Sequence, residues 1–203
     1  SDLDGELVAG TARALDQLRR ADWELRDARG RTLVPVPTPE DKPPALASVY
    51  ALSKFDQEQL CLMVGAAYGI PTTALRFFNV FGTRQALSNP YTGVLAIFAA
   101  RLLNGNPPMI FEDGLQQRDF VSVYDVARAG RLALDCEEAA GLAINIGSGR
   151  VYTVLEVASL LNAVLGRDIE PDITGKYRVG DIRHCVADIS LARRVLGYEP
   201  EVT

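Results

Sequence analysis

The sequence predicts an α/β fold, because segments typical of strands alternate with segments typical of helices along most of its 203 residues. Short apolar runs rich in β-branched and aromatic residues indicate the strands, and apolar residues repeated every three or four positions indicate the helices. Glycine and proline residues stand between these segments, where turns are expected. A hydrophobic content of 48% is ordinary for a globular chain, and the length suffices for roughly one to one and a half domains.

The first predicted elements lie between residues 35 and 82. Residues 35–44 are rich in proline, so we expect an extended segment there. Phe55 to Tyr68 is predicted to be an amphipathic helix that stops at Gly69. Its core-facing residues are expected to be Leu60, Met63, Val64 and Ala67. Residues 71–82 are predicted to form a buried strand that runs into a glycine turn.

Local signals place further elements downstream. Helices are expected at 94–103, 125–135 and 154–165, and strands at 109–111, 120–123 and 143–146. The helix at 154–165 has the clearest start, since Thr153 and Glu156 match a capping box. Residues 1–34 combine near-helical apolar spacing between Leu3 and Arg20 with many charges, which predicts a surface helix and loop.

The charge pattern excludes some kinds of partner. The chain has 21 basic and 26 acidic residues, which gives a net charge of -5. The charges are mixed and no basic run is present, so nucleic acid is not an expected partner. No apolar stretch approaches the roughly 18 residues of a membrane span, and no signal peptide precedes the acidic start. We therefore expect a soluble, cytoplasmic protein without a membrane partner.

The thiol and imidazole groups do not form a metal-binding pattern. Cys61, Cys136 and Cys185 are scattered, odd in number and without CxxC spacing, which predicts reduced, buried thiols. His184 is the single histidine and cannot build a zinc site by itself, so no metal is expected. We expect His184 to pack or hydrogen-bond beside Arg183 rather than to act in catalysis.

Tyr50 and Lys54 are the first candidate catalytic pair. Residues four positions apart share one face of a helix, so the phenol and the ammonium can act on one proton. Tyrosine has an unperturbed pKa of about 10, so a tyrosine base near pH 7 needs roughly 4 kcal/mol of differential stabilisation from nearby positive charge. The YxxxK spacing also occurs by chance in many helices, in which case both side chains lie on a solvated face.

Four ordered blocks embed this pair in a longer pattern. They are the proline segment, YALSK helix and RFFNVFG strand at 35–82, the DGLQQRDFVSVYDVA segment at 113–127, the NIGSG turn at 145–149, and the GDIRHCVADIS segment at 180–190. In this order and spacing, over about residues 35–203, the blocks resemble the extended short-chain dehydrogenase/reductase family. The resemblance is strongest to its NAD-dependent nucleotide-sugar epimerases and dehydratases.

The resemblance implies the C-terminal part of a Rossmann-like doubly wound sheet plus a smaller substrate-binding α/β subdomain. Residues 1–34 would be a variable insertion and 35–92 the C-terminal part of the NAD-binding domain. Residues 93–203 would mainly form the nucleotide-sugar-binding subdomain, with 119–146 returning to the NAD-binding domain. The family's GxxGxxG turn for the cofactor pyrophosphate is missing, and Gly147-Ser148-Gly149 is interpreted as a plain strand-to-helix turn. We therefore expect a fragment truncated at both ends.

The resemblance also implies site residues. Tyr50 would be the catalytic base, and Tyr50, Lys54 and Phe77 would bind NAD. Lys54 would lower the pKa of Tyr50 and hydrogen-bond the nicotinamide ribose, and Phe77 would contact the nicotinamide end. The expected substrate-binding residues are Asn79, Val94, Arg118, Arg178 and Asp181. The two arginines would grip the diphosphate, because guanidinium forks match phosphate oxygens. Alternatively, Arg118 forms a surface ion pair with Asp113 or Asp119, and Arg178 with Asp181.

The implied function is 4-epimerisation of a UDP- or dTDP-sugar by transient oxidation with NAD, in a homodimer. The alternatives are a nucleotide-sugar 4,6-dehydratase or decarboxylase, an oxidoreductase of a non-sugar carbonyl, and a truncated, non-catalytic nucleotide-sugar-binding fragment. The family also has a catalytic Ser or Thr before the tyrosine, but the expected window holds Glu24, Leu25, Arg26 and Asp27. We expect that hydroxyl upstream of Ser1, displaced by an insertion at 1–34.

Overall fold

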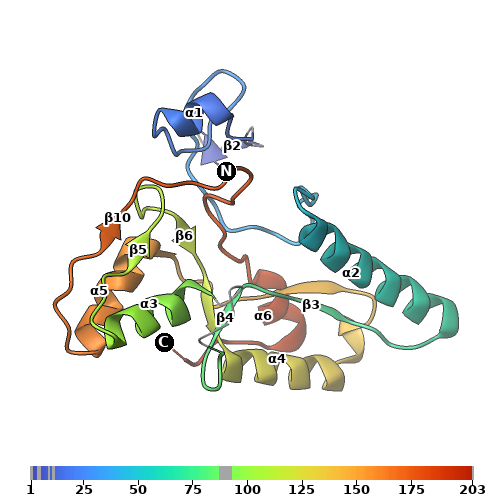
Figure 1. Ribbon diagram of the computed structural model, residues 1–203. Coiled ribbons are helices and arrows are strands. Elements are labelled where there is room, and N and C mark those ends of the chain that lie inside the picture. Colours follow the sequence, from blue (N-terminus) through green and yellow to red (C-terminus); the bar gives the residue numbers. More distant parts are fainter. Residues whose placement is uncertain (1, 4–5, 9, 11, 87–92, 203) are drawn as a thin grey trace. The chain divides into compact units, whose positions relative to one another are not determined.

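The computed structural model describes residues 2–3, 6–8, 10, 12–86 and 93–202. The chain divides into two compact units, which are coloured along the sequence in Figure 1. Unit 1 comprises residues 1–36, 83–118 and 151–186, and unit 2 comprises residues 37–82, 119–150 and 187–203. Residues 87–92, where the predicted domain boundary falls, lie outside the described residues.

Unit 1 contains short strands and three helices within its described residues. They are β1 (Asp2–Leu3), β2 (Glu6–Leu7), α1 (Leu15–Arg19), α3 (Val94–Leu103), β5 (Met109–Ile110), β6 (Gln117–Arg118), β9 (Tyr152–Thr153), α5 (Val154–Val164) and β10 (Asp172–Ile173). Strand β5 pairs with β10 in parallel, whereas β1 pairs with β2 and β6 with β9 in antiparallel. Helices α3 and α5 pack together and bury Phe98, Leu102 and Val157.

The predicted capping box at the start of α5 is confirmed. The Thr153 Oγ1 atom accepts a hydrogen bond from Glu156 N at 3.1 Å, and Glu156 Oε2 accepts one from Thr153 N at 2.7 Å. These bonds satisfy backbone N–H groups that have no partner inside the helix. The helix therefore begins where the local sequence signal places it.

Residues 1–36 are integrated into unit 1. The predicted helix between Leu3 and Arg20 is reduced to α1, and β1 and β2 precede it. The expectation of a surface segment does not hold for Leu18, Trp23 and Leu33, which are buried. The physical reason is that several charged side chains of this segment have partners inside unit 1, so its polar groups do not require solvent.

Unit 2 contains two parallel strand pairs and the remaining helices. Its elements are α2 (Val49–Tyr68), β3 (Ala74–Phe77), β4 (Asn79–Phe81), β7 (Phe120–Ser122), α4 (Val123–Asp135), a 3₁₀ turn (Glu137–Ala139), β8 (Ala143–Ile146) and α6 (Ser190–Leu196). Strand β3 pairs with β8 and β4 pairs with β7. The core lies where α4 and α6 meet β8, around Ile144, Ile146 and Leu196.

Parallel strands linked through helices agree with the predicted α/β fold. The single buried strand predicted over 71–82 is instead two strands, β3 and β4, which pair with different partners. Both are only half-buried, and Phe77 at the end of β3 is exposed. The break occurs at Phe78, whose backbone N still bonds Ile146 O at 3.1 Å before the pairing changes to β7.

Helix α2 begins earlier than predicted and exposes its apolar face. The Ser48 side chain caps it by accepting a hydrogen bond from Ala51 N, and Gly69 ends it with a φ of 66°. The predicted core positions Leu60, Met63 and Val64 are 56%, 58% and 48% exposed, so that prediction is wrong for the described chain. Ala67 is also exposed. The residue of α2 that is buried is Gly65, where a Cβ would lie 2.3 Å from Thr72 Oγ1.

All three cysteines are free thiols. Cys136 and Cys185 are half-buried, but Cys61 is exposed on α2, so the prediction of buried thiols is wrong for Cys61. Cys61 is exposed because it lies on α2, whose apolar face is itself exposed. Among the helices that the structure describes, none is long and apolar enough to cross a membrane.

Candidate functional site

The predicted site residues lie on both units. Unit 2 carries Tyr50, Lys54, Phe77 and Asn79, and unit 1 carries Val94, Arg118, Arg178 and Asp181. The four residues of unit 1 are brought together, because all of them line one pocket.

Tyr50 and Lys54 lie side by side at the start of α2. The Lys54 ammonium is 5.8 Å from the centroid of the Tyr50 ring, and its Nζ atom donates to Gln57 Oε1 at 3.2 Å. The Tyr50 side chain is 71% exposed. The helical spacing thus places a cation beside a phenol that is open to a ligand from solution.

An ion pair fixes α2 against strand β3. Arg76 on β3 donates from Nε and Nη2 to the two carboxylate oxygens of Glu58, at 2.7 and 2.8 Å. Its Nη1 donates to the backbone oxygen of Glu40 at 2.9 Å. The hydrogen bonds from Arg76 hold the pKa of Glu58 below its ordinary value. Glu58 is one helical turn beyond Lys54, so this bidentate contact orients the helix that bears the candidate pair.

The Gly147-Ser148-Gly149 turn is bound to a buried carboxylate of the protein. Asp119 is fully buried and accepts hydrogen bonds from Ser148 N at 2.7 Å and Gly149 N at 2.9 Å. A Cβ on Gly147 would lie 2.6 Å from Asp119 Oδ2. These contacts agree with the prediction of a plain turn, because the N–H groups that a pyrophosphate would need are already occupied.

Asn79 is attached to the same strand end. Its Nδ2 atom donates to the backbone oxygen of Asp119 at 3.0 Å, which uses one of the two side-chain N–H groups. Among the described residues, none bonds its other N–H or its amide oxygen. Contact of Asn79 with a substrate phosphate stays a prediction.

Unit 1 contains a pocket of about 530 Å³, a size typical of small-molecule sites. Its apolar wall is formed by Val94, Ile97, Phe98, Met109, Phe111 and Val154, and its polar part by Arg101, Gln116, Arg118, Arg178 and Asp181. Three guanidinium groups and one carboxylate give this lining a net charge of +2. The pocket therefore suits an anion attached to an apolar or aromatic group.

Gln116 places an unused acceptor at this pocket. Its Nε2 atom donates to Phe111 O at 2.7 Å, but the buried Oε1 atom has no hydrogen-bond partner within the described part of the chain. A buried acceptor without a partner costs about 1–3 kcal/mol, so such atoms commonly mark a position that a ligand or water completes.

Arg118 and Arg178 have different surroundings in the pocket. Arg118 donates from Nη1 to Gln117 O and Arg183 O, both at 2.8 Å, and from Nη2 to Ile182 O at 2.7 Å. Burial lowers the pKa of Arg118. The alternative of surface ion pairs with Asp113 or Asp119 is therefore wrong for Arg118. Arg178 lies over the Phe111 ring, with 5.3 Å between the guanidinium carbon and the ring centroid.

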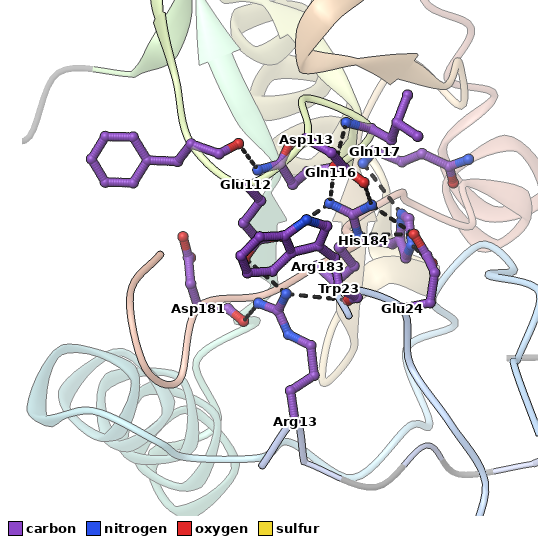
Figure 2. A network of polar contacts seen from close by, with 12 residues as sticks. Arg13, Trp23, Glu24, Glu112, Asp113, Gln116, Gln117, Asp181, Arg183 and His184 are labelled. Carbon is purple, nitrogen blue, oxygen red and sulfur yellow. Dashed lines mark hydrogen bonds and ion pairs between the residues drawn. The ribbon is translucent and has the colours of Figure 1, made fainter. Parts of the chain in front are cut away.

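Arg183 is the centre of the polar network in Figure 2. Its side chain is fully buried and contacts three carboxylates: Glu24 at 2.6 Å, Glu112 at 2.9 Å and Asp113 at 2.7 Å. Burial of a guanidinium is tolerated here because its donors are paired with carboxylates. The network fixes the chain segment that carries Asp181 to the segments that carry Glu24 and Glu112.

His184 and Arg13 extend this network, as Figure 2 shows. The His184 Nε2 atom is 3.1 Å from Glu24 Oε2, and Nδ1 accepts a hydrogen bond from Gln117 N at 3.3 Å. The prediction that His184 hydrogen-bonds beside Arg183 is confirmed. Arg13 contacts Glu112 Oε1 at 2.7 Å and donates to Asp181 O at 2.8 Å. Sequence reasoning missed Arg13 and Glu24, because no local signal links them to residues about 100 or more positions away.

Glu24 is expected to make the stability of unit 1 sensitive to acid. The hydrogen bond from His184, followed by Arg183, lowers the pKa of Glu24 from 4.5 to about 2. Because the folded pKa is below the unfolded one, this stabilisation is present above pH 4.5 and is lost as the pH falls towards 2. We expect Glu24→Gln to lose less stability than the parent protein as the pH falls from 4.5 to 2. The stability is measured as the midpoint of urea unfolding, followed by Trp23 fluorescence. Glu170→Gln, at an exposed position, is the control. If the urea midpoints of Glu24→Gln and the parent fall in parallel with pH, Glu24 is not the source of the acid sensitivity.

Comparison with known proteins defines the class. A model of the NAD dependent epimerase/dehydratase family matches residues 8–147, and the chain belongs to this family. It is similar to a dTDP-L-rhamnose 4-epimerase of Burkholderia thailandensis, with 35% identity over 198 residues, 98% of this chain and 53% of that protein. The chain therefore spans about half the length of the curated relatives it matches.

Solved structures give the same class. A UDP-glucose 4-epimerase of Thermotoga maritima, solved with UDP-glucose, is 38% identical with a TM-score of 0.78, over 86% of this chain and 55% of that one. A UDP-glucuronic acid 4-epimerase of Bacillus cereus, in complex with UDP-glucuronic acid and NAD, is 30% identical with a TM-score of 0.75, over 84% and 53%. The fold class and the family inferred from the sequence are both confirmed.

Proposed function

We propose that this chain takes part in the NAD-dependent 4-epimerisation of a UDP- or dTDP-sugar, with Tyr50 as the base. The proposal is carried by the exposed Tyr50 phenol with the Lys54 ammonium 5.8 Å from its ring, on a chain of the NAD dependent epimerase/dehydratase family. The names of the similar proteins support the reaction and the substrate class.

The residues of unit 2 suit the nicotinamide half of NAD. The Lys54 ammonium is a donor for a ribose hydroxyl, and the exposed ring of Phe77 offers an apolar contact at the carboxyl end of β3. The backbone N–H groups of Ser148 and Gly149 are held by Asp119. Within the described residues, therefore, that turn does not supply the pyrophosphate site.

In the proposed mechanism, Tyr50 acts as a phenolate and takes the proton from the C4 hydroxyl of the sugar. Lys54 stabilises the phenolate by its positive charge. Lys54 and Phe77 would hold the nicotinamide half of NAD, which would supply reversible hydride transfer at C4 of the sugar. Tyr50 gives its proton back to the C4 oxygen when the product forms, so no net oxidation of the sugar results.

The pocket of unit 1 is the proposed place for the nucleoside diphosphate. Arg178 and the remaining donors of Arg118 would face the diphosphate, and Asp181 and the backbone at Val94 would contact the rest of the substrate. Contact of Asn79 with a substrate phosphate is proposed from the family resemblance alone. The apolar wall with Phe111 offers a surface for the base.

Two further features of the proposal come from the sequence. A homodimer is expected by family resemblance, and the exposed apolar side chains Leu60, Met63 and Val64 on α2 are consistent with a partner surface. A cytoplasmic location likewise stays a prediction. Sedimentation velocity of the intact protein tests the dimer, since a monomer at micromolar concentration would contradict it.

The function is tested by identifying products. The intact protein is incubated with NAD and, separately, UDP-glucose, UDP-galactose, their N-acetyl forms, UDP-glucuronic acid and dTDP-glucose, and the products are identified by NMR. We expect inversion at C4 for at least one of them. Loss of water or of carbon dioxide would favour the dehydratase or decarboxylase alternative instead. Binding of these sugars without conversion would identify a binding fragment.

A further inference from the structure

Arg101 offers the pocket of unit 1 a guanidinium group that the predicted site does not include. It lies in the last turn of α3 and lines the pocket. Its Nε atom donates to Pro107 O at 2.5 Å, which fixes the direction of the side chain. In the part of the chain that the structure describes, its Nη1 and Nη2 atoms have no hydrogen-bond or ion-pair partner. Four N–H donors on one fork are therefore available to a ligand.

Arg118 is less available than Arg101. Of its five N–H groups, three point to the backbone oxygens of Gln117, Ile182 and Arg183, so at most two remain. The bonds to Ile182 and Arg183 attach the strand β6 to the segment that bears Asp181. Breaking the bond to the buried Arg183 to bind a phosphate would leave its carbonyl group without this donor, which is unfavourable.

Arg178 has the second free fork. Its guanidinium stacks on the Phe111 ring at 5.3 Å, and the described residues offer it no hydrogen bond or ion pair. A cation over an aromatic face is oriented by the ring while its N–H groups stay free. Arg101 and Arg178 come from different segments and line the same pocket.

We infer that Arg101, together with Arg178, forms the anion-binding grip of this pocket, to which Arg118 adds its two remaining donors. For the identity of the ligand, the inference rests on the proposed function: the anion is the pyrophosphate diester of a nucleotide sugar. That diester carries two negative charges, which match the net charge of +2 of the lining. Two guanidinium forks bind phosphate oxygens in pairs, and the apolar wall beside them accommodates the base.

The inference is tested by isothermal titration of the intact protein with UDP, inorganic pyrophosphate and uridine. We expect Arg101→Gln to weaken UDP and pyrophosphate binding by about 10- to 100-fold, because charged hydrogen bonds are lost, and to leave uridine binding unchanged. Arg101→Lys keeps the charge without the fork, so its affinity for UDP and pyrophosphate is expected to lie between those of the parent and Arg101→Gln. Arg167→Gln, an exposed arginine of unit 1 outside the pocket, is the matched control.

The outcomes separate this inference from the proposed function. If the parent protein binds UDP and Arg101→Gln binds it within twofold, the grip is wrong while the nucleotide-sugar function stands. If the parent binds pyrophosphate in an Arg101-dependent way but binds no UDP, the grip stands and the proposed substrate class is wrong. If it binds neither ligand, both are wrong.

A measurement on the parent protein avoids any effect of substitution on folding. Phenylglyoxal reacts with accessible guanidinium groups, and mass spectrometry of peptides locates the products. We expect Arg101 and Arg178 to react and pyrophosphate to protect both by at least about fivefold. Arg118 is expected to react more slowly, because its guanidinium is half-buried and bonded to three carbonyl groups. Equal labelling of Arg101 with and without pyrophosphate would overturn the inference.

Discussion

Replacing Tyr50 with phenylalanine is expected to lower turnover by at least about 100-fold while leaving the bound NAD content unchanged. Loss of a positioned general base costs about 100- to 10,000-fold, because the proton of the sugar hydroxyl then has no acceptor in the transition state. The ring of Tyr50 is exposed, so removal of the hydroxyl leaves the packing of α2 intact. The measurement is kcat of the intact protein for the substrate found by NMR, with NAD content determined after denaturation.

The control for this substitution lies on the same helix. Tyr68 is the last residue of α2 and is also exposed, so Tyr68→Phe removes an equivalent hydroxyl far from Lys54 along the helix. Its kcat is expected to equal that of the parent. Turnover of Tyr50→Phe within about tenfold of the parent would refute the base, since that loss is too small for a missing proton acceptor.

Replacing Arg183 with methionine is expected to destabilise unit 1 by about 3 kcal/mol. The substitution keeps much of the side-chain volume but leaves the buried Glu112 and the partly buried Glu24 and Asp113 without this partner. Removing one partner of a buried ion pair typically costs about 3–5 kcal/mol. The lower end applies because Glu24 and Asp113 are about one third exposed and Glu112 keeps Arg13.

Urea unfolding followed by Trp23 fluorescence measures this effect locally. Trp23 is the single tryptophan and lies beside the Arg183 network in unit 1, as Figure 2 shows. Arg19→Met is the matched control, because the Arg19–Asp16 pair of the same unit is 63% and 78% exposed. Exposed pairs contribute about 0–1 kcal/mol, so this control should stay near the parent. If Arg183→Met unfolds at the same urea concentration as Arg19→Met, the buried network does not stabilise unit 1.

Features that depend on neighbouring residues were predictable from the sequence. The helix at Val94–Leu103 and the strand at Ala143–Ile146 have the predicted bounds, and the capping box at Thr153 is present. These elements begin and end where glycine, proline or a capping side chain sets the local backbone conformation. Such signals act within a few residues, so one sequence contains them completely.

The wrong predictions concern which side chains are buried rather than which helices and strands form. The apolar spacing of Leu60, Met63 and Val64 predicts a helix correctly, but spacing alone does not say what covers that face. Residues 1–34 were predicted to lie on the surface because of their charge, yet Arg13 and Glu24 pair with Glu112, Arg183 and His184. Charged residues are normally exposed unless they are paired, and the partners of Arg13 and Glu24 are distant in sequence.

By itself, the sequence determined the family, the α/β fold class and the Tyr50–Lys54 pair, because ordered motifs and helical spacing are local properties of the chain. Only the tertiary structure decided which arginines are available to a ligand. Arg118 and Arg101 look alike as charges in a sequence, but three carbonyl groups occupy Arg118 while the terminal nitrogens of Arg101 remain free within the described residues. Hydrogen-bond capacity is used up by neighbours in space, and a sequence does not record those neighbours.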